Sequence, residues 1–167
     1  MVANLPYNVS SRLIFRFHEH RDLFGSLSII LQKEVAERLI APPSTKDYGV
    51  LTVLLGVSAN VRILFDVPGK AFYPKPDVTS SFVRIVFPEE PPVPVADPGL
   101  LQRLVKASFA GRRKTLRNCL RSARLPGVPF DRLAEAASAA DIDLGRRGET
   151  LTPEEFARFT DAVGQNA

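Results

Sequence analysis

The chain has 167 residues, 45% of them hydrophobic, and its 22 lysines and arginines against 18 acidic residues give a formal net charge of +4. This length suits one domain, or one domain with an appendage. A single cysteine, Cys119, excludes an internal disulfide and favours a reducing cytoplasm, and no apolar run approaches the roughly 18 residues that span a membrane. The histidines, His18 and His20, and Cys119 lack the spacing of metal ligands, so we predict no metal site.

The chain opens with a short apolar stretch, residues 1–3, that reads as the end of a buried strand, followed by Asn4-Leu5-Pro6-Tyr7. Open α/β sheets bind ligands at the carboxyl ends of their strands. There the Asn4 side-chain oxygen could accept one N–H, and a carbonyl beside Pro6 could accept another. Tyr7 could stack on a purine, a contact worth about 1–3 kcal/mol per base. Methylation of an adenine N6 amine needs these groups, but the tetrapeptide alone fits an ordinary Asn-x-Pro turn equally well.

Hydrophobic periodicity predicts alternating helices and strands as far as residue 87. We expect Ser10-Ser11 to cap the first helix and Gly25 to stop it. The expected elements are a helix over 10–24, a strand over 27–31, a helix over 33–40, a short helix within the ambiguous stretch 48–59, and strands over 61–67 and 80–87. The last two strands are joined only by a loop, which favours an antiparallel edge on a parallel sheet. This order is typical of the back half of a doubly wound methyltransferase sheet.

Five of the fourteen prolines lie from Pro88 to Pro98, which predicts a linker there. Beyond it we expect only helices, over 100–109, 112–123 and 130–140, and a last one that a capping box at 152–155 opens and that runs to Val163. The expected division is a partial catalytic domain over 1–87, the linker over 88–98, and a helical domain over 99–167.

Residues 100–130 carry eight basic residues and no acidic one. The arginines recur at intervals of four, four and three, which predicts that they share one helical face: Arg113, Arg117, Arg121 and Arg124. Leu116, Cys119, Leu120 and Ala123 would form the opposite, packed face, while Arg112 and Lys114 widen the charge. Phosphates would neutralise such a row, since arginine binds them bidentately. The alternative is a solvated face that pairs with the acidic residues of 131–167.

A loop between the two last strands holds Phe72-Tyr73-Pro74-Lys75-Pro76. Prolines stiffen such a loop, so it could present Phe72 against a base from the side opposite Tyr7. Packing of Phe72 in the core is the alternative.

Together these segments resemble the bacterial ribosomal RNA adenine N6-dimethyltransferases. The resemblance covers essentially the whole chain, and its motifs occur in the family's order. The matching segments are NLPYNVSS at 4–11, QKEVAERL at 32–39, Tyr48-Gly49, FYPKPDVTSSFVRI at 72–85, FAGRRKTLRNCL at 109–120, and Arg147, Glu149 and 151–156 near the end.

The resemblance implies a class I methyltransferase domain followed by a small helical domain. It implies N6,N6-dimethylation of two adjacent adenines near the 3′ end of 16S ribosomal RNA in the 30S subunit, with S-adenosylmethionine as donor. Asn4 and the Leu5 carbonyl would bind the target amine, Tyr7 and Phe72 would clamp the flipped adenine, and Asn4 would border the donor. The basic residues from Arg112 to Arg124 would grip the RNA.

The family's glycine-rich donor loop is missing, because the ten glycines form no G-x-G pattern and the chain begins at what would be the fourth strand. We therefore expect this polypeptide alone to bind the donor poorly and to be inactive. Two other functions stay open: a macrolide-resistance type 23S RNA methyltransferase, against which FAGRRKTLRN argues, and a non-catalytic 30S assembly factor. A DNA adenine methyltransferase is disfavoured, because no element resembles one that recognises the sequence of double-stranded DNA.

Overall fold

The computed structural model describes residues 1–74, 76–123 and 125–165. Its four strands are β1 (Val2–Asn4), β2 (Ser26–Gln32), β3 (Asn60–Val67) and β4 (Ser80–Val86). Its helices are α1 (Ser10–Glu19), α2 (Lys33–Leu39), α3 (Val50–Ser58), α4 (Pro98–Ser108), α5 (Leu116–Ala123), α6 (Phe130–Ala139) and α7 (Pro153–Gln165). Short 3-10 turns are η1 (Arg21–Leu23), η2 (Gly69–Ala71) and η3 (Gly148–Thr150).

The strands form one sheet in the order β1-β2-β4-β3. β1 pairs with β2 in parallel, whereas β4 is antiparallel to both of its neighbours. The prediction of an antiparallel pair at the edge of a parallel sheet is confirmed. The expectation that the first residues are buried is wrong: Val2 is 80% exposed, because β1 is the edge strand and has a strand on one side only.

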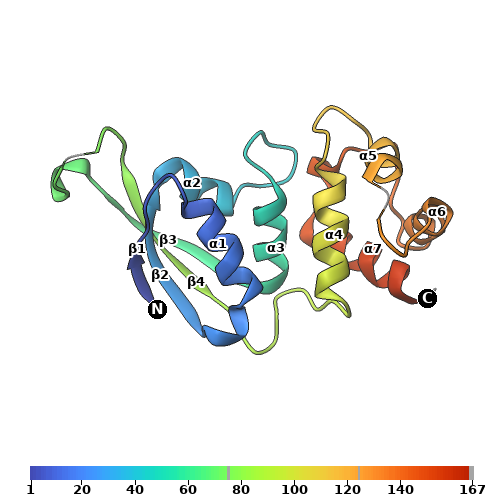
Figure 1. Ribbon diagram of the computed structural model, residues 1–167, viewed down its shortest axis with the longest axis horizontal. Coiled ribbons are helices and arrows are strands. Elements are labelled where there is room, and N and C mark those ends of the chain that lie inside the picture. The colour runs from blue at the N-terminus through green and yellow to red at the C-terminus, as the bar shows by residue number, and fades with distance from the viewer. Residues whose placement is uncertain (75, 124, 166–167) are drawn as a thin grey trace.

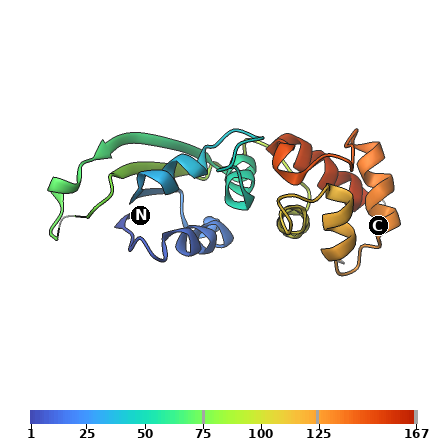
Figure 2. The ribbon, with the colours of Figure 1, turned by 90° about the horizontal axis from the view of Figure 1, so that it is seen from above.

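Helices cover one face of this sheet. Alternate residues of β2 and β4, such as Leu27, Ile29 and Val83, are fully buried and form a core with Ile14 of α1 and Leu55 of α3. The opposite face carries the exposed Arg62 and Arg84, and Figure 2 shows no helix over it in the described part of the chain. This alternation follows from the two-residue period of a strand.

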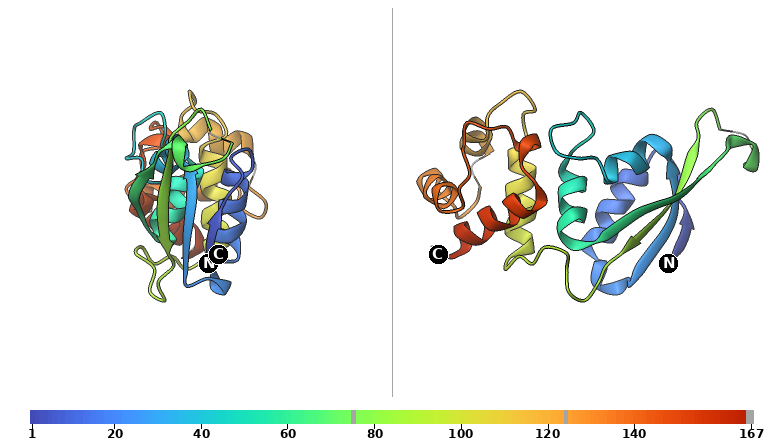
Figure 3. Two further views of the ribbon diagram at one scale, coloured as in Figure 1. Left: turned by 90° about the vertical axis from the view of Figure 1, so that its left-hand side faces the viewer. Right: turned by 180° about the vertical axis from the view of Figure 1, so that it is seen from behind.

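The four last helices pack around a second core at the other end of the molecule, so that the two chain termini lie at opposite ends (Figure 1). Leu54 and Val57 of α3 belong to this second core, whereas Leu55 of the same helix belongs to the first. The two cores therefore meet at α3, which lies between the sheet and the last four helices in the view from behind in Figure 3. The division into domains at 88–98 stays a prediction.

Most expected elements are present with ends shifted by a few residues, and the ambiguous stretch 48–59 is helix α3. The serines do not cap α1, because Ser10 already lies inside the helix and its hydroxyl donates to the Tyr7 carbonyl at 3.1 Å. The helix expected from residue 112 begins only at Leu116. Ala123, expected on the packed face, is exposed.

The predicted capping box of α7 is confirmed. The Glu155 amide donates to Thr152 Oγ1 at 3.2 Å, and the Thr152 amide donates to Glu155 Oε2 at 2.8 Å. Across the described residues, no helix is both long enough and apolar enough to cross a bilayer.

Candidate active site and RNA-binding surface

The segment Asn4–Tyr7 leaves the sheet at the carboxyl end of β1 and turns into α1. Leu5 is buried and anchors the turn in the first core. The Val9 amide donates to the Pro6 carbonyl at 3.2 Å, which closes the turn. The motif therefore lies where open α/β sheets bind ligands, as the sequence predicts.

Tyr7 is held from across the sheet. Its hydroxyl shares a hydrogen bond of 2.5 Å with Oγ of Ser80, the fully buried first residue of β4. This bond fixes the direction of the ring, which is half-buried. The role of Ser80 was missed from the sequence, although a serine at the start of an otherwise apolar strand was a visible signal.

The four residues Asn4, Leu5, Pro6 and Tyr7 line an open pocket of about 280 Å³. Asn4 is exposed, and within the described part of the chain no hydrogen bond engages its side-chain amide or the Leu5 carbonyl. Both oxygens are therefore available as acceptors, and the tyrosine ring beside them offers a flat apolar surface. This set of groups can hold a planar base that carries an exocyclic amine.

Phe72 lies elsewhere on the same end of the sheet. It follows η2 in the loop from β3 to β4, which extends beyond the strands in Figures 1 and 2, and it is half-buried. It is not among the described residues that line the pocket at Asn4. The clamp of a base between Tyr7 and Phe72 stays a prediction.

An ion pair joins the start of α2 to β3 near this end of the sheet. Lys33 Nζ lies 2.6 Å from Asp66 Oδ2, and Ser81 Oγ donates to Asp66 Oδ1 at 2.7 Å. The hydrogen bond from Lys33 holds the pKa of the Asp66 carboxyl below its usual value. Lys33 and Ser81 are both bonded to Asp66, which gives the three groups a structural role.

The basic residues divide into two groups. Arg113 does not share a helical face with Arg117 and Arg121, because it lies in the turn before α5; Arg124 lies outside the described residues. Arg112 is engaged internally: its guanidinium hydrogen-bonds the Lys46 carbonyl and lies 3.7 Å from Glu149. Arg121 stacks over the Phe130 ring at 4.8 Å.

Arg113, Lys114 and Arg117 form the second group, which we call the basic turn. All three side chains are exposed, and no ion pair involves them within the described residues. The α4–α5 loop that carries the first two lies along the upper edge of the molecule in Figure 1, on the same side as the turn after β1. The bond from Arg112 to Lys46 joins this loop to the segment 41–49 between the two sites.

The sequence model of the family described as "Ribosomal RNA adenine dimethylase" matches residues 1–159. The chain belongs to the ribosomal RNA adenine dimethylase family. It is 48% identical over 161 residues to a ribosomal RNA small subunit methyltransferase A of Geobacter sulfurreducens, covering 96% of this chain and 58% of the relative. The corresponding protein of Syntrophotalea carbinolica is 45% identical over 163 residues, covering 98% of this chain and 61% of the relative.

Solved structures agree on the fold of this dimethylase family member. A dimethyladenosine transferase from Plasmodium falciparum has a TM-score of 0.76 and 25% identity, covering 95% of this chain and 64% of the other. The 23S rRNA methyltransferase ErmE has a TM-score of 0.64 at 23% identity, covering 98% and 64%, which supports the fold alone. The chain thus spans about three fifths of the length of its curated relatives, and the predicted fold class, a methyltransferase sheet with a helical part, is confirmed.

Proposed function

We propose that this chain is the part of a ribosomal RNA adenine dimethyltransferase that receives the target adenine and grips the RNA around it. The reaction is the transfer of two methyl groups to N6 of each of two adjacent adenines near the 3′ end of small-subunit RNA. The observation that carries this proposal is the pocket at Asn4, where unengaged amide and carbonyl oxygens lie beside a tyrosine ring fixed by Ser80. The names of the relatives support the small-subunit RNA as substrate.

In this site the Asn4 oxygen and the Leu5 carbonyl accept the two N–H bonds of the adenine amine, and Tyr7 stacks on the extruded ring. The amine of adenine is a weak nucleophile, since its lone pair is delocalised into the ring. Holding both hydrogens turns the lone pair toward an incoming methyl group, so positioning provides most of the catalysis. The basic turn contacts RNA phosphates along the same edge of the molecule.

The residues described here do not fit the methyl donor, S-adenosylmethionine, on their own. Its ribose hydroxyls and amino-acid group require several polar partners, whereas the pocket offers the Asn4 amide, the Leu5 carbonyl and a Tyr7 hydroxyl already bonded to Ser80. Beside it, β1 presents an open edge with an exposed Val2. We therefore assign Asn4 to the border of the donor site and place the other donor contacts outside this chain.

The test is to incubate the chain with small ribosomal subunits that lack N6-dimethyladenine. We expect binding without methylation in the presence of S-adenosylmethionine, and calorimetry should detect no micromolar affinity for the donor. Replacing Arg113 and Arg117 by Glu should abolish binding, because two attractive charges become repulsive. Equal binding to large subunits would contradict the substrate assignment, and dimethyladenine in the product would contradict the assignment of the donor contacts.

A further inference from the structure

The face of the sheet that the helices leave uncovered carries two neighbouring rows of side chains. The view from behind in Figure 3 shows the strands of this face in front of the helices. Asn4, Ile30, Phe82 and Phe65 follow one another across the strands in the first row. Arg84 and Arg62 lie opposite each other in the next row. We call the two phenylalanines and the two arginines the open sheet patch.

The phenylalanines of the patch form a stacked pair of rings. The ring centroids of Phe65 and Phe82 lie 5.1 Å apart, with 26° between the ring planes. Phe65 is 57% exposed, and neither ring is among the described residues that make up the two cores. Aromatic rings exposed on a sheet are surfaces on which unpaired nucleic-acid bases stack. The pair therefore offers a base-binding surface that folding does not use.

The arginines of the patch lack a counter-charge. Arg62 and Arg84 are both exposed, and no ion pair engages either among the described residues. Like charges directly opposite on neighbouring strands destabilise a sheet. The strands hold one acidic residue, Asp66, and it lies on the helix-covered side, where Ser81 is its partner. A phosphate between the two arginines would neutralise both, since arginine binds phosphate bidentately.

The first row begins at the adenine pocket. Asn4 lines that pocket, and Ser80, which holds Tyr7, precedes Phe82 by two residues and so lies on the same face. Neighbouring strands are about 4.8 Å apart, which places the strand of Phe82 about 10 Å from β1. An RNA strand whose adenine enters the pocket can therefore continue over the open sheet patch.

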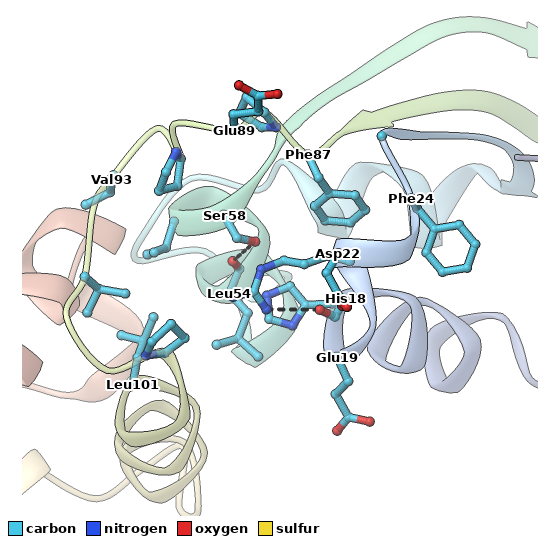
Figure 4. A pocket seen from close by; sticks show the side chains of 17 residues that line it. His18, Glu19, Asp22, Phe24, Leu54, Ser58, Phe87, Glu89, Val93 and Leu101 are labelled. Carbon is cyan, nitrogen blue, oxygen red and sulfur yellow. Dashed lines mark hydrogen bonds between the residues drawn. The ribbon is translucent and has the colours of Figure 1, made fainter.

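The helix-covered side of the sheet carries the opposite charge. A pocket of about 660 Å³ lies there between α1, α3 and α4 and includes the buried His18 (Figure 4). Three carboxylates, those of Glu19, Asp22 and Glu89, line it against one cation among the described residues, Arg21. This lining repels a polyanion, so the distribution of charge favours the uncovered face for RNA.

We propose that the open sheet patch binds the single-stranded RNA that adjoins the target adenine, with bases stacked on Phe65 and Phe82 and a phosphate between Arg62 and Arg84. The RNA must be unpaired there, because bases inside a duplex stack on one another and present no free face. This inference rests on the proposed function for the identity of the RNA, and it adds a contact separate from the basic turn.

A short oligouridine tests the patch by itself, because it offers no adenine amine to Asn4 and forms no hairpin. Stacking on aromatic rings tolerates any base, so we expect wild type to bind it. Photocrosslinking with thiouridine in the oligonucleotide, followed by mass spectrometry, should attach the RNA to peptides that contain Phe65 or Phe82. Crosslinks at the basic turn alone, or no binding at millimolar concentration, would overturn the proposal.

Variants of the patch separate stacking from charge. Phe65→Leu keeps an apolar side chain but removes the ring, so oligouridine should bind about fivefold more weakly, the lower end of the range for one stacked base. Arg62→Gln combined with Arg84→Gln should reduce the slope of log affinity against log salt by about 0.7 for each phosphate no longer neutralised. An unchanged affinity in the first variant, or an unchanged slope in the second, would overturn the proposal.

The matched control for the arginine variant is Arg103→Gln combined with Arg158→Gln. These arginines are exposed on α4 and α7, away from the sheet, and their replacement removes the same charge. The control should bind oligouridine with the affinity and salt slope of wild type. An equal loss of slope in the control would assign the effect to net charge and overturn the proposal.

The proposed function is tested separately with small-subunit RNA hairpins that have adenine or purine, which lacks the amine, at the target position. Oligouridine binding that depends on the patch, without a preference for adenine, would contradict the proposed function and leave the RNA-binding patch standing. A preference for adenine, with oligouridine affinity unchanged in the patch variants, would overturn this inference alone. A wild-type dimer that becomes monomeric in Phe65→Leu, with no oligouridine bound by either, would assign the patch to a second copy of the chain and also overturn it.

Discussion

At the scale of single residues, the amine-binding site that we propose at the turn after β1 needs few groups. Asn4 is exposed and makes no side-chain hydrogen bond among the described residues, so folding places no demand on its amide. Tyr7, in contrast, is bonded to a buried serine 73 residues away along the chain. The site therefore combines one group that is free to bind with one that is fixed in position.

Replacing Asn4 by Ala should weaken the preference for adenine at the target position. The preference is the ratio of the affinities for a small-subunit RNA hairpin with adenine there and for one with purine, which lacks the amine. This ratio should fall about 2–10-fold in the variant, since a hydrogen bond contributes about 0.5–1.5 kcal/mol and the Leu5 carbonyl still accepts the other N–H, and the melting temperature should not change. Asn8→Ala, another exposed asparagine, serves as the control; a variant at Asn4 that discriminates as strongly as wild type would contradict the assignment of its oxygen.

At the scale of elements, the sequence predicted the strands and helices well because their apolar periodicity is strong. The start of α5 was missed for a physical reason: the amides of Leu116 and Arg117 donate to the carbonyls of Arg146 and Leu144, at 2.8 and 3.0 Å. These bonds give the amides at the start of the helix hydrogen-bond acceptors that lie in a distant segment of the chain. Local pattern could not reveal them, and it placed Arg113 on a helix that begins three residues later.

The capping box of α7 should make a measurable contribution to the free energy of unfolding. Thr152→Ala removes the acceptor of the Glu155 amide and should lower the free energy of unfolding by about 1 kcal/mol in urea titration. Thr79→Ala, at an exposed position before β4, is expected to change it by less than about 0.5 kcal/mol. Equal losses in the two variants would mean that the capping bond contributes nothing measurable.

The basic turn makes a prediction about salt. Replacing Arg113 and Arg117 by Gln should weaken RNA binding and reduce the slope of log affinity against log salt by about 0.7–0.9 for each RNA phosphate that the variant no longer neutralises. Arg158→Gln, an exposed arginine on α7 outside the basic turn, should leave the slope unchanged. An unchanged slope in the double variant would show that these side chains face solvent in the complex, the alternative that the sequence left open.

At the scale of the whole molecule, the buried His18 should make the fold sensitive to acid. Its pKa is lowered from 6.5 to about 4 in the folded chain, mainly by burial and then by Arg21. Between these values the unfolded chain binds a proton that the folded chain excludes, so stability falls as pH drops from about 6.5 to 4. At about 1.4 kcal/mol per unit of pKa, the loss is on the order of 3 kcal/mol.

Urea titrations at pH 7 and pH 5 measure the part of this loss that falls between the two values, about 2 kcal/mol. His18→Phe should abolish most of the difference between the two, whereas His20→Phe, at an exposed position, should preserve it. A difference that survives in His18→Phe would assign the acid sensitivity to carboxylates such as Glu155, whose pKa the ion pair with Arg146 lowers.

The sequence thus predicted the antiparallel pairing of the last two strands, the family and the position of the turn after β1 at the end of a strand, because these rest on local pattern and motif. It did not predict the bond between Tyr7 and Ser80, the internal engagement of Arg112 and Arg121, or the pocket at His18. Each of these depends on contacts between segments far apart along the chain.

The most direct test of the central claim is a thermodynamic cycle on the base that Tyr7 is proposed to hold. Affinity is measured for the small-subunit RNA hairpin with adenine or an abasic site at the target position, using wild type and Tyr7→Ala. The loss of affinity at the abasic site should be smaller in Tyr7→Ala than in wild type by about 1–3 kcal/mol, the contribution of stacking on the ring. The variant should keep only the preference for adenine that Asn4 and the Leu5 carbonyl provide. A Tyr7→Ala chain that distinguishes the two RNAs as wild type does would contradict the account.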